Sequence, residues 1–308
     1  MIRKIVYEID ESFDKKTVLS FLRYKNFSSR LIKELKKNPH GILIRNKKVT
    51  VQKTLKAGDV LTVYIKEKET ASEALTPVKL PLDIVFEDKD VIVCNKPPFM
   101  ATHPSQDNHG TTLANALAFH FLENGGPKTV RSVNRLDKNT SGLILVAKNM
   151  HASGVLSDDL KVKKVRREYL AFVEGCPDEM EGTVNAPIAR CEGSTIKRCV
   201  DFEKGDSAVT HYTVVKKGEF SLLKLSLETG RTHQIRVHMS HIGHAVAGDF
   251  LYGTEFSGGM DRHALHSYTL EFTHPVTNEI LSFKAPLPED MKRLYEKQWG
   301  EINETFDF

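Results

Sequence analysis

A polar, charged segment runs directly into an apolar one between residues 131 and 148. Its sequence, RSVNRLDKNTSGLILVAK, places Asp137 a few residues before GLILVAK, a run that we interpret as a buried strand. A carboxylate positioned beside a rigid strand can act as a nucleophile or as a base. An Asp followed by Thr-Ser-Gly is also a common turn or cap residue. Spacing alone therefore leaves a catalytic and a structural interpretation open.

Two other residues have side chains that could assist such a carboxylate. Tyr169, in REYLAFVEG, shares one face of a predicted strand with Ala171 and Val173, where an ordinary core tyrosine is the alternative. Arg231 follows a strand-like run and precedes Thr232, a candidate cap for the helix HQIRVHMSHI. A cation there, reinforced by the positive end of the helix, would keep a nearby carboxylate ionised. A structural ion pair is the alternative interpretation of Arg231.

The histidines and cysteines do not follow the spacing of a metal site. No HExxH arrangement or CxxC pair occurs, and neither GxGxxG nor GxxxxGK[ST] is present. The residues concerned are His233, His238, His241, His244, Cys94, Cys176, Cys191 and Cys199. We therefore expect no metal and no cofactor.

Positive charge is concentrated near the start of the 308-residue chain. Residues 1–70 contain 17 Lys and Arg against 8 Asp and Glu, although the net charge of the whole chain is only +4. Such segregation is typical of a polyanion-binding module attached to a more neutral body, with a solvated basic surface as the alternative. The opening MIRKIVYEIDES lacks the apolar core of a signal peptide, and no stretch is long and apolar enough to span a membrane. We expect a cytoplasmic protein and a monomer.

The basic segment predicts a small α/β domain. Helices are expected from Ser12 to Tyr24, capped by Ser12 or Asp14, and from Ser28 to Lys37, followed by two alternating strand-like runs. The second helix would present a cationic face made of Arg30, Lys33, Lys36 and Lys37. We assign residues 1–70 to this domain and the proline-containing residues 71–82 to a linker.

Residues 83–308 predict the larger domain. IVFEDKDVIVCNKP reads as a hairpin, residues 112–124 as a helix, and further strands and helices interleave without a regular βαβ repeat. The expected fold class is α+β, with a mixed, largely antiparallel sheet flanked by helices.

Several motifs of this larger domain resemble one enzyme family in the same order. RLDKNTSGL resembles the HRLDxxTSGL signature of RluA-type pseudouridine synthases, although Asn134 stands where that signature has histidine. Further resemblances are carried by NKPPFMATHPS, REYLAFVEG, GRTHQIRVHMSHIGHAVAGDFLYG and RHALHSYTLEFTHP. The N-terminal segment resembles the RNA-binding domain of ribosomal protein S-four type.

This resemblance implies an enzyme that isomerises uridine in structured RNA without a cofactor. Asp137 would be the catalytic carboxylate, Arg231 the cation paired with it, and Tyr169 the aromatic residue beside the base. Arg135 would contact the RNA whose target nucleotide has been flipped out of its stack. Ribosomal RNA is the expected partner, with transfer RNA as an alternative. A non-catalytic RNA-binding or ribosome-assembly protein and a carboxylate-dependent hydrolase are the competing interpretations.

Overall fold

The computed structural model describes residues 2–66, 75–105, 110–126 and 129–302. The first of these ranges forms a module with its own sheet, in the strand order β1-β4-β2-β3, and its own apolar core. Its strands are β1 (Ile2–Glu8), β2 (Ile42–Ile44), β3 (Lys47–Lys48) and β4 (Val60–Lys66). The strand β1 had not been predicted. The predicted linker falls in part on residues 67–74, outside the described ranges.

Two helices cover the sheet of the module. Helix α2 (Ser29–Lys37) matches its prediction, with the Ser28 side chain accepting from the backbone N–H of Leu31. Helix α1 (Val18–Tyr24) begins later than predicted, and its cap is Thr17 rather than Ser12 or Asp14. A short 3-10 turn (Glu11–Phe13) precedes it, and Lys15 adopts a φ of 61°, which interrupts a right-handed helix.

The larger body is built on a ten-stranded sheet. Its main path runs β10-β13-β14-β9-β15-β8-β6-β5, with β16 paired to β15 and β7 paired to β8. Among the named strands, only β15 and β8 pair in parallel. The expected α+β class with a mixed, largely antiparallel sheet is confirmed. The bounds are β5 (Ile84–Glu87), β6 (Val91–Lys96), β7 (Arg131–Ser132), β8 (Ser141–Ala147), β9 (Arg166–Glu174), β10 (Glu181–Asn185), β13 (Val209–Lys216), β14 (Phe220–Leu227), β15 (Leu265–Thr273) and β16 (Ile280–Lys284).

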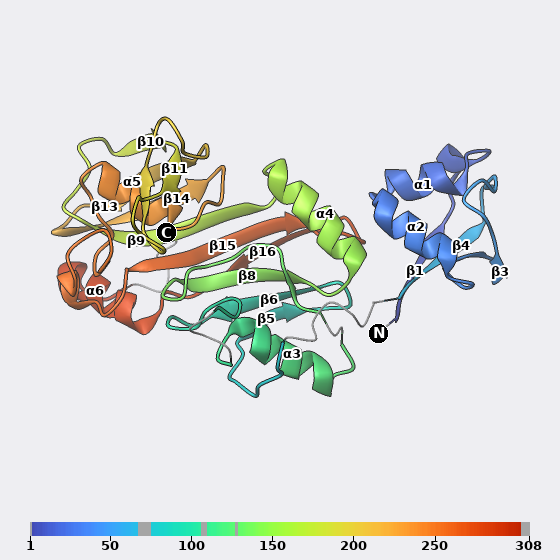
Figure 1. Cartoon of the computed structure of the whole chain (residues 1–308), viewed down its shortest axis with the longest axis horizontal. Coiled ribbons are helices and arrows are strands. Elements are labelled where there is room, and N and C mark those ends of the chain that lie inside the picture. The colour runs from blue at the N-terminus through green and yellow to red at the C-terminus, as the bar shows by residue number, and fades with distance from the viewer. Residues whose placement is uncertain (1, 67–74, 106–109, 127–128, 303–308) are drawn as a thin grey trace.

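Helices lie on both faces of this sheet (Figure 1). Helix α3 (Leu113–Glu123) packs in a core with Ile92 and Ile144, whereas α4 (Met150–Lys161) packs in another with Val91 and Leu145. Since alternate residues of a strand point to opposite faces, the two helices cover opposite sides of β6 and β8. Helices α5 (Gln234–His241) and α6 (Glu289–Trp299) join the first of these cores, and β11 (Ile188–Arg190) and β12 (Arg198–Val200) form a separate hairpin. Of the helices described, none is both long and apolar enough to cross a membrane.

Gly142 allows the close approach of β8 to β15. Its φ is 108°, and a Cβ at this position would lie 2.2 Å from the carbonyl oxygen of Ser267. Only glycine tolerates both constraints. Ser141 and Gly142 begin β8, the strand that anchors the Asp137 loop, so this part of the Thr-Ser-Gly motif has a structural role.

Candidate active site

A cavity of about 560 Å³ brings together the three residues that the sequence predicted to be catalytic. Asp137 enters it from the loop before β8, Tyr169 from β9, and Arg231 from the segment between β14 and α5. His233 and Arg236, at the start of α5, complete the polar part of the wall. The cavity thus combines a carboxylate, a phenol and several cationic or titratable nitrogens.

The loop that carries Asp137 is tied to its surroundings on both sides of the carboxylate. The Thr102 hydroxyl donates to the Leu136 carbonyl at 2.8 Å, and the Arg262 guanidinium donates to the Asn139 carbonyl at 2.9 Å. The fully buried Lys96 Nζ donates to the Lys138 carbonyl at 3.1 Å. These bonds hold the backbone on each side of Asp137, so that little entropy remains to be lost when its side chain is positioned.

Lys96 also bonds to the loop that follows β6. Its Nζ donates to the carbonyls of Pro97 and Met100 at 2.8 and 2.7 Å, so that three acceptors match the three donors of an ammonium group. Burial, assisted by the charge of Arg262, lowers the pKa of Lys96 to about 7, and the charge of Asp137 opposes this shift. Through these three contacts Lys96 joins two loops beside the carboxylate.

Asn134 takes a supporting position in the same loop. Its Oδ1 accepts from the backbone N–H of Leu145 at 2.8 Å, and its Nδ2 donates to the carbonyl of Leu143 at 3.3 Å. Both groups belong to β8. The residue that departs from the RluA-type signature thus fixes the loop to the strand.

The cation nearest to Asp137 is Arg236. Its Nη1 lies 3.5 Å from Asp137 Oδ2, and its Nε and Nη2 donate to the two carboxylate oxygens of Asp249 at 2.6 and 2.7 Å. The side chain of Arg236 is 3% exposed and that of Asp249 is fully buried. Burial opposes the charge of Arg236, but its hydrogen bonds with Asp249 and the charges of Asp249 and Asp137 outweigh burial and raise its pKa.

Arg231 lies elsewhere on the cavity wall. Its Nε donates to the Ser207 carbonyl at 3.1 Å, and its Nη1 lies 3.3 Å from Asp206 Oδ2. The prediction that Arg231 pairs with Asp137 is therefore wrong, because this side chain turns toward the segment before β13. The predicted cap is wrong as well: His233, with a φ of 60° and no capping side-chain bond, stands at the N-cap position in place of Thr232.

His233 links the carboxylate to a tyrosine. Its Nε2 lies 3.9 Å from Asp137 Oδ2, and its Nδ1 lies 2.8 Å from the hydroxyl of Tyr252. The backbone N–H of Arg198 donates to that same hydroxyl at 2.8 Å, which leaves the hydroxyl proton free to point at Nδ1. Burial lowers the pKa of His233, with the charge of Asp137 opposing it, so that a neutral ring with its proton on Nε2 faces the carboxylate.

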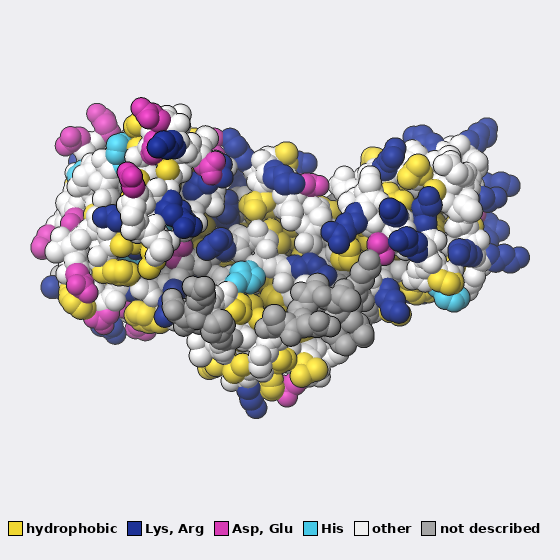
Figure 2. Space-filling model, viewed as in Figure 1, with side chains coloured by type: hydrophobic (Ala, Val, Ile, Leu, Met, Phe, Trp, Pro, Cys, Tyr) yellow, Lys and Arg dark blue, Asp and Glu magenta, His cyan; other side chains and the backbone are white. Residues whose placement is uncertain are grey.

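The predicted RNA-binding residues occupy two separate places. Arg135 is exposed and lines the cavity. Arg30, Lys33, Lys36 and Lys37 are exposed on α2, in the module rather than at the cavity. Figure 2 shows Lys and Arg side chains crowded over this module at the right of the view, and Asp and Glu side chains more frequent at the opposite end.

Arg236, Asp249 and Tyr252 were not singled out from the sequence. The signal for Arg236 was present in THQIRVH, because His233 and Arg236 are three positions apart and share a helix face. Tyr252 and Asp249 carried no comparable signal, since they lie in a loop that only the fold brings to the cavity.

Comparison with known proteins agrees with this geometry. A family model described as RNA pseudouridylate synthase matches residues 90–241. The protein named uncharacterized RNA pseudouridine synthase YjbO of Bacillus subtilis is 43% identical over 279 residues, which cover 90% of this chain and 98% of that protein. Ribosomal large subunit pseudouridine synthase D of Zymomonas mobilis is 38% identical over 272 residues, 84% of each chain.

Solved structures show the same architecture. Human RNA pseudouridylate synthase domain containing 1 superposes with a TM-score of 0.56 at 28% identity, covering 70% of this chain and 87% of the human one. Human RNA pseudouridylate synthase domain containing 4 gives a TM-score of 0.57 at 21% identity, covering 70% and 92%. The second likeness is one of fold alone.

Proposed function

Since this chain belongs to the RNA pseudouridine synthase family, we propose that it isomerises specific uridines of ribosomal RNA with Asp137 as its catalytic carboxylate. One observation carries the proposal. The Asp137 carboxylate, 19% exposed in the cavity, faces the buried guanidinium of Arg236 at 3.5 Å. A fixed cation at that distance balances the charge of the carboxylate and holds it in position for any of its routes.

The reaction needs no external reagent. The bond from ribose C1′ to uracil N1 breaks and a bond from C1′ to C5 forms, while C5 loses a proton and N1 gains one. An ionised Asp137 can begin this sequence by attacking the ribose or the uracil ring, or by removing a proton from the sugar. In each route the carboxylate acts from a position that Arg236 and the surrounding loop already hold.

The cavity suits a nucleotide that has left its stack. A base within a helix cannot reach Asp137, so the target must be flipped out at a cost of a few kcal/mol. Tyr169, 4% exposed at the cavity wall, is proposed to lie against the flipped base, and the exposed Arg135 to contact the displaced RNA. Arg231, held by Asp206 at the same wall, is proposed to contact substrate phosphate or ribose rather than Asp137.

Ribosomal RNA is the proposed substrate for two reasons. Several similar proteins are named ribosomal large subunit pseudouridine synthase D, and they come from three further bacteria besides Zymomonas mobilis. The exposed cations of α2 would add phosphate contacts to a large, folded RNA. Transfer RNA is the second candidate substrate. The pseudouridine mapping experiment described next distinguishes the two RNAs.

The experiment compares pseudouridine maps of total RNA from cells with the wild-type protein, without it, and with Asp137→Asn. The wild-type protein should restore specific pseudouridines in ribosomal RNA, and Asp137→Asn should restore none. Asp158→Asn is the matched control, because it removes one carboxylate from the exposed surface of α4. Normal modification by Asp137→Asn would overturn the catalytic assignment, and binding without any modification by the wild type would favour a non-catalytic ribosome-assembly role.

A further inference from the structure

The N-terminal module is attached to the larger body by a buried ion pair between residues that lie far apart in the sequence. Arg3 on β1 donates from Nε and Nη2 to the two oxygens of Asp90, at 2.8 and 2.6 Å. The side chain of Asp90 is 2% exposed and that of Arg3 is 15% exposed. A bidentate pair of this kind fixes orientation as well as distance, because both planar groups must be aligned.

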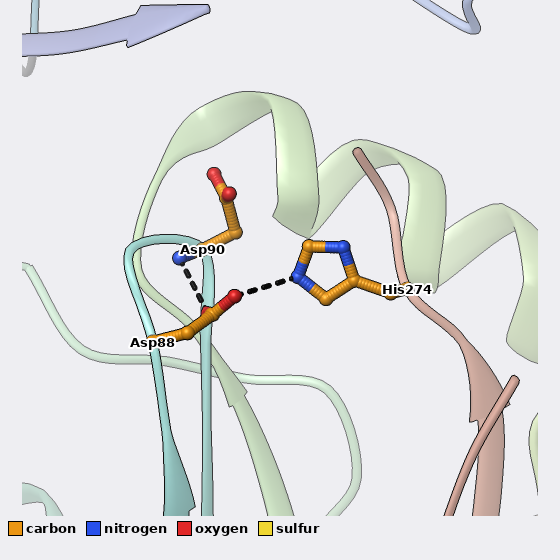
Figure 3. Close-up of side chains that lie close together, drawn as sticks. All are labelled: Asp88, Asp90 and His274. Carbon is orange, nitrogen blue, oxygen red and sulfur yellow. Dashed lines mark hydrogen bonds and ion pairs between the residues drawn. The ribbon is translucent and has the colours of Figure 1, made fainter. Parts of the chain in front are cut away.

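Asp90 is held in place from within the larger body. Asn149, the cap of α4, donates from Nδ2 to Asp90 Oδ1 at 2.7 Å. The neighbouring Asp88 accepts from the backbone N–H of Asp90 at 2.7 Å, and His274 Nε2 lies 2.9 Å from the other oxygen of Asp88 (Figure 3). The acceptor for Arg3 is therefore fixed by the turn before β6, the start of α4 and the turn after β15.

Asp88, Asp90 and His274 also have the spacing of a metal site, but their bonding does not suit a metal ion. Arg3 occupies both oxygens of Asp90. His274 Nδ1 accepts from the backbone N–H groups of Val276 and Thr277 at 3.3 and 3.0 Å, so the ring proton belongs on Nε2, which lies 2.9 Å from Asp88 Oδ2. The cluster is built to receive a guanidinium.

Apolar contacts complete this junction. Phe27 of the module stacks on His151 with ring centroids 4.1 Å apart and an interplanar angle of 21°. Met150 and Val276 of the larger body pack against the module's core. Burial lowers the pKa of His151 to about 4, so that the stacked ring is neutral near pH 7. The junction thus combines an ion pair with a desolvated aromatic contact.

Helix α4 connects the junction to the cavity. Its first two residues, Met150 and His151, contact the module, whereas Leu160 and Lys161 at its other end line the cavity. Twelve residues of helix span about 18 Å, with no hinge between them. Figure 1 shows α4 lying between the module and the part of the body that contains α5.

We infer that this junction, made by Arg3, Asp90, Phe27 and His151, holds the module at a fixed separation from the cavity and thereby selects the target uridine. The inference rests on the proposed contact between α2 and RNA. Domains joined by small interfaces move relative to one another by default, and a mobile module would accept RNA of many shapes. A fixed module accepts only a folded RNA whose shape suits the fixed separation. In such an RNA, the RNA helix that contacts α2 and the flipped uridine are as far apart as α2 and the cavity.

The test uses two variants at the junction, one on each side. Arg3→Met removes the guanidinium from the module, and His151→Ala removes the stacked ring from the larger body without changing the module. Lys4→Met is the matched control, because it also removes one cation from β1 but from an exposed position. Thermal melting of all three proteins checks that they remain folded.

Two measurements decide the inference. Small-angle scattering should give a larger maximum dimension for both junction variants than for the wild type and Lys4→Met. On a folded ribosomal RNA fragment that contains the mapped uridine, both variants should lose about tenfold or more in kcat/KM and modify additional uridines. On a short hairpin oligonucleotide with the same uridine, their kcat should be unchanged, because the cavity is intact.

Junction variants with wild-type dimensions would overturn the fixed attachment. Variants that expand but retain wild-type selectivity on the folded fragment would overturn the role in target choice. A wild-type protein that forms no pseudouridine on either RNA would instead overturn the proposed substrate, and the scattering comparison would still decide whether the junction is rigid.

Discussion

Arg236 Nη1 lies 3.5 Å from the carboxylate oxygen Oδ2 of Asp137, and the side chain of Arg236 is 3% exposed. Its other two guanidinium nitrogens are bonded to Asp249, so the position of the cation does not depend on the substrate. A charge that is fixed before the reaction requires no reorganisation when charge develops in the transition state. This relationship defines the electrostatics of the cavity.

Replacing Arg236 should therefore lower the rate far more than replacing Arg231. Arg236→Lys cannot bond to both oxygens of Asp249 and still reach Asp137, and we expect kcat to fall on the order of 100-fold or more. Arg231→Lys retains a cation at the cavity wall and should mainly raise KM. Single-turnover rates of pseudouridine formation check this, and an equal loss of kcat in the two variants would contradict the assignment of Arg236.

Asp249→Asn should weaken the fold and the reaction together. The substitution leaves a buried guanidinium with one fewer charged partner, and the free energy of unfolding should fall by roughly 3–5 kcal/mol. Asp206→Asn is the matched control, since it removes the exposed partner of Arg231 and should change stability by about 0–1 kcal/mol. Urea unfolding of both variants provides the comparison, and similar losses would show that the Arg236–Asp249 pair contributes no more than a surface pair.

Acid should destabilise the protein through buried histidines. Burial lowers the pKa values of His151 and His266 to about 4, so the unfolded chain binds more protons than the folded one between pH 4 and about 6.5. Stability from these neutral rings is complete above that window and is lost as the pH falls through it. Each ring should account for roughly 2 kcal/mol between pH 7.5 and pH 5.

Urea unfolding at these two pH values measures the effect. His151→Gln should reduce the pH dependence of the unfolding free energy by the share of one histidine. His40→Gln, which replaces an exposed histidine of the module, is the control. An unaltered dependence in His151→Gln would mean that His151 is not held neutral.

The cations of α2 should contribute a salt-dependent part of the affinity for RNA. Replacing Lys33, Lys36 and Lys37 together by Gln should reduce the slope of log affinity against log salt by roughly 1 for each phosphate contact that is lost. Replacing Lys47 and Lys48 of β3 by Gln removes exposed cations from another element of the module and is the control. Filter binding to a ribosomal RNA fragment from low to moderate salt measures both slopes, and identical reductions per lysine would indicate a diffuse charge effect rather than a contact by α2.

Local patterns in the sequence were sufficient to predict most helices and strands of the larger body. The hairpin formed by β5 and β6, the helix α3 and the strand β8 were predicted because their apolar residues recur with the period of the element. The start of α1 was missed, since the positive φ of Lys15 and the capping bond of Thr17 depend on the turn as folded. The strand β1 was missed too, because its partner β4 lies more than fifty residues further along the chain.

Sequence by itself therefore determined the fold class, the loop-to-strand position of Asp137 and the family signature around it. The tertiary structure decided which arginine faces that carboxylate: Arg231 and Arg236 lie on either side of the left-handed residue His233, and of these two only Arg236 lies near Asp137. It also decided that Arg3 meets Asp90, 87 residues away along the chain. Periodicity records the face of an element on which a residue lies, whereas contacts between distant elements arise from packing that no local pattern contains.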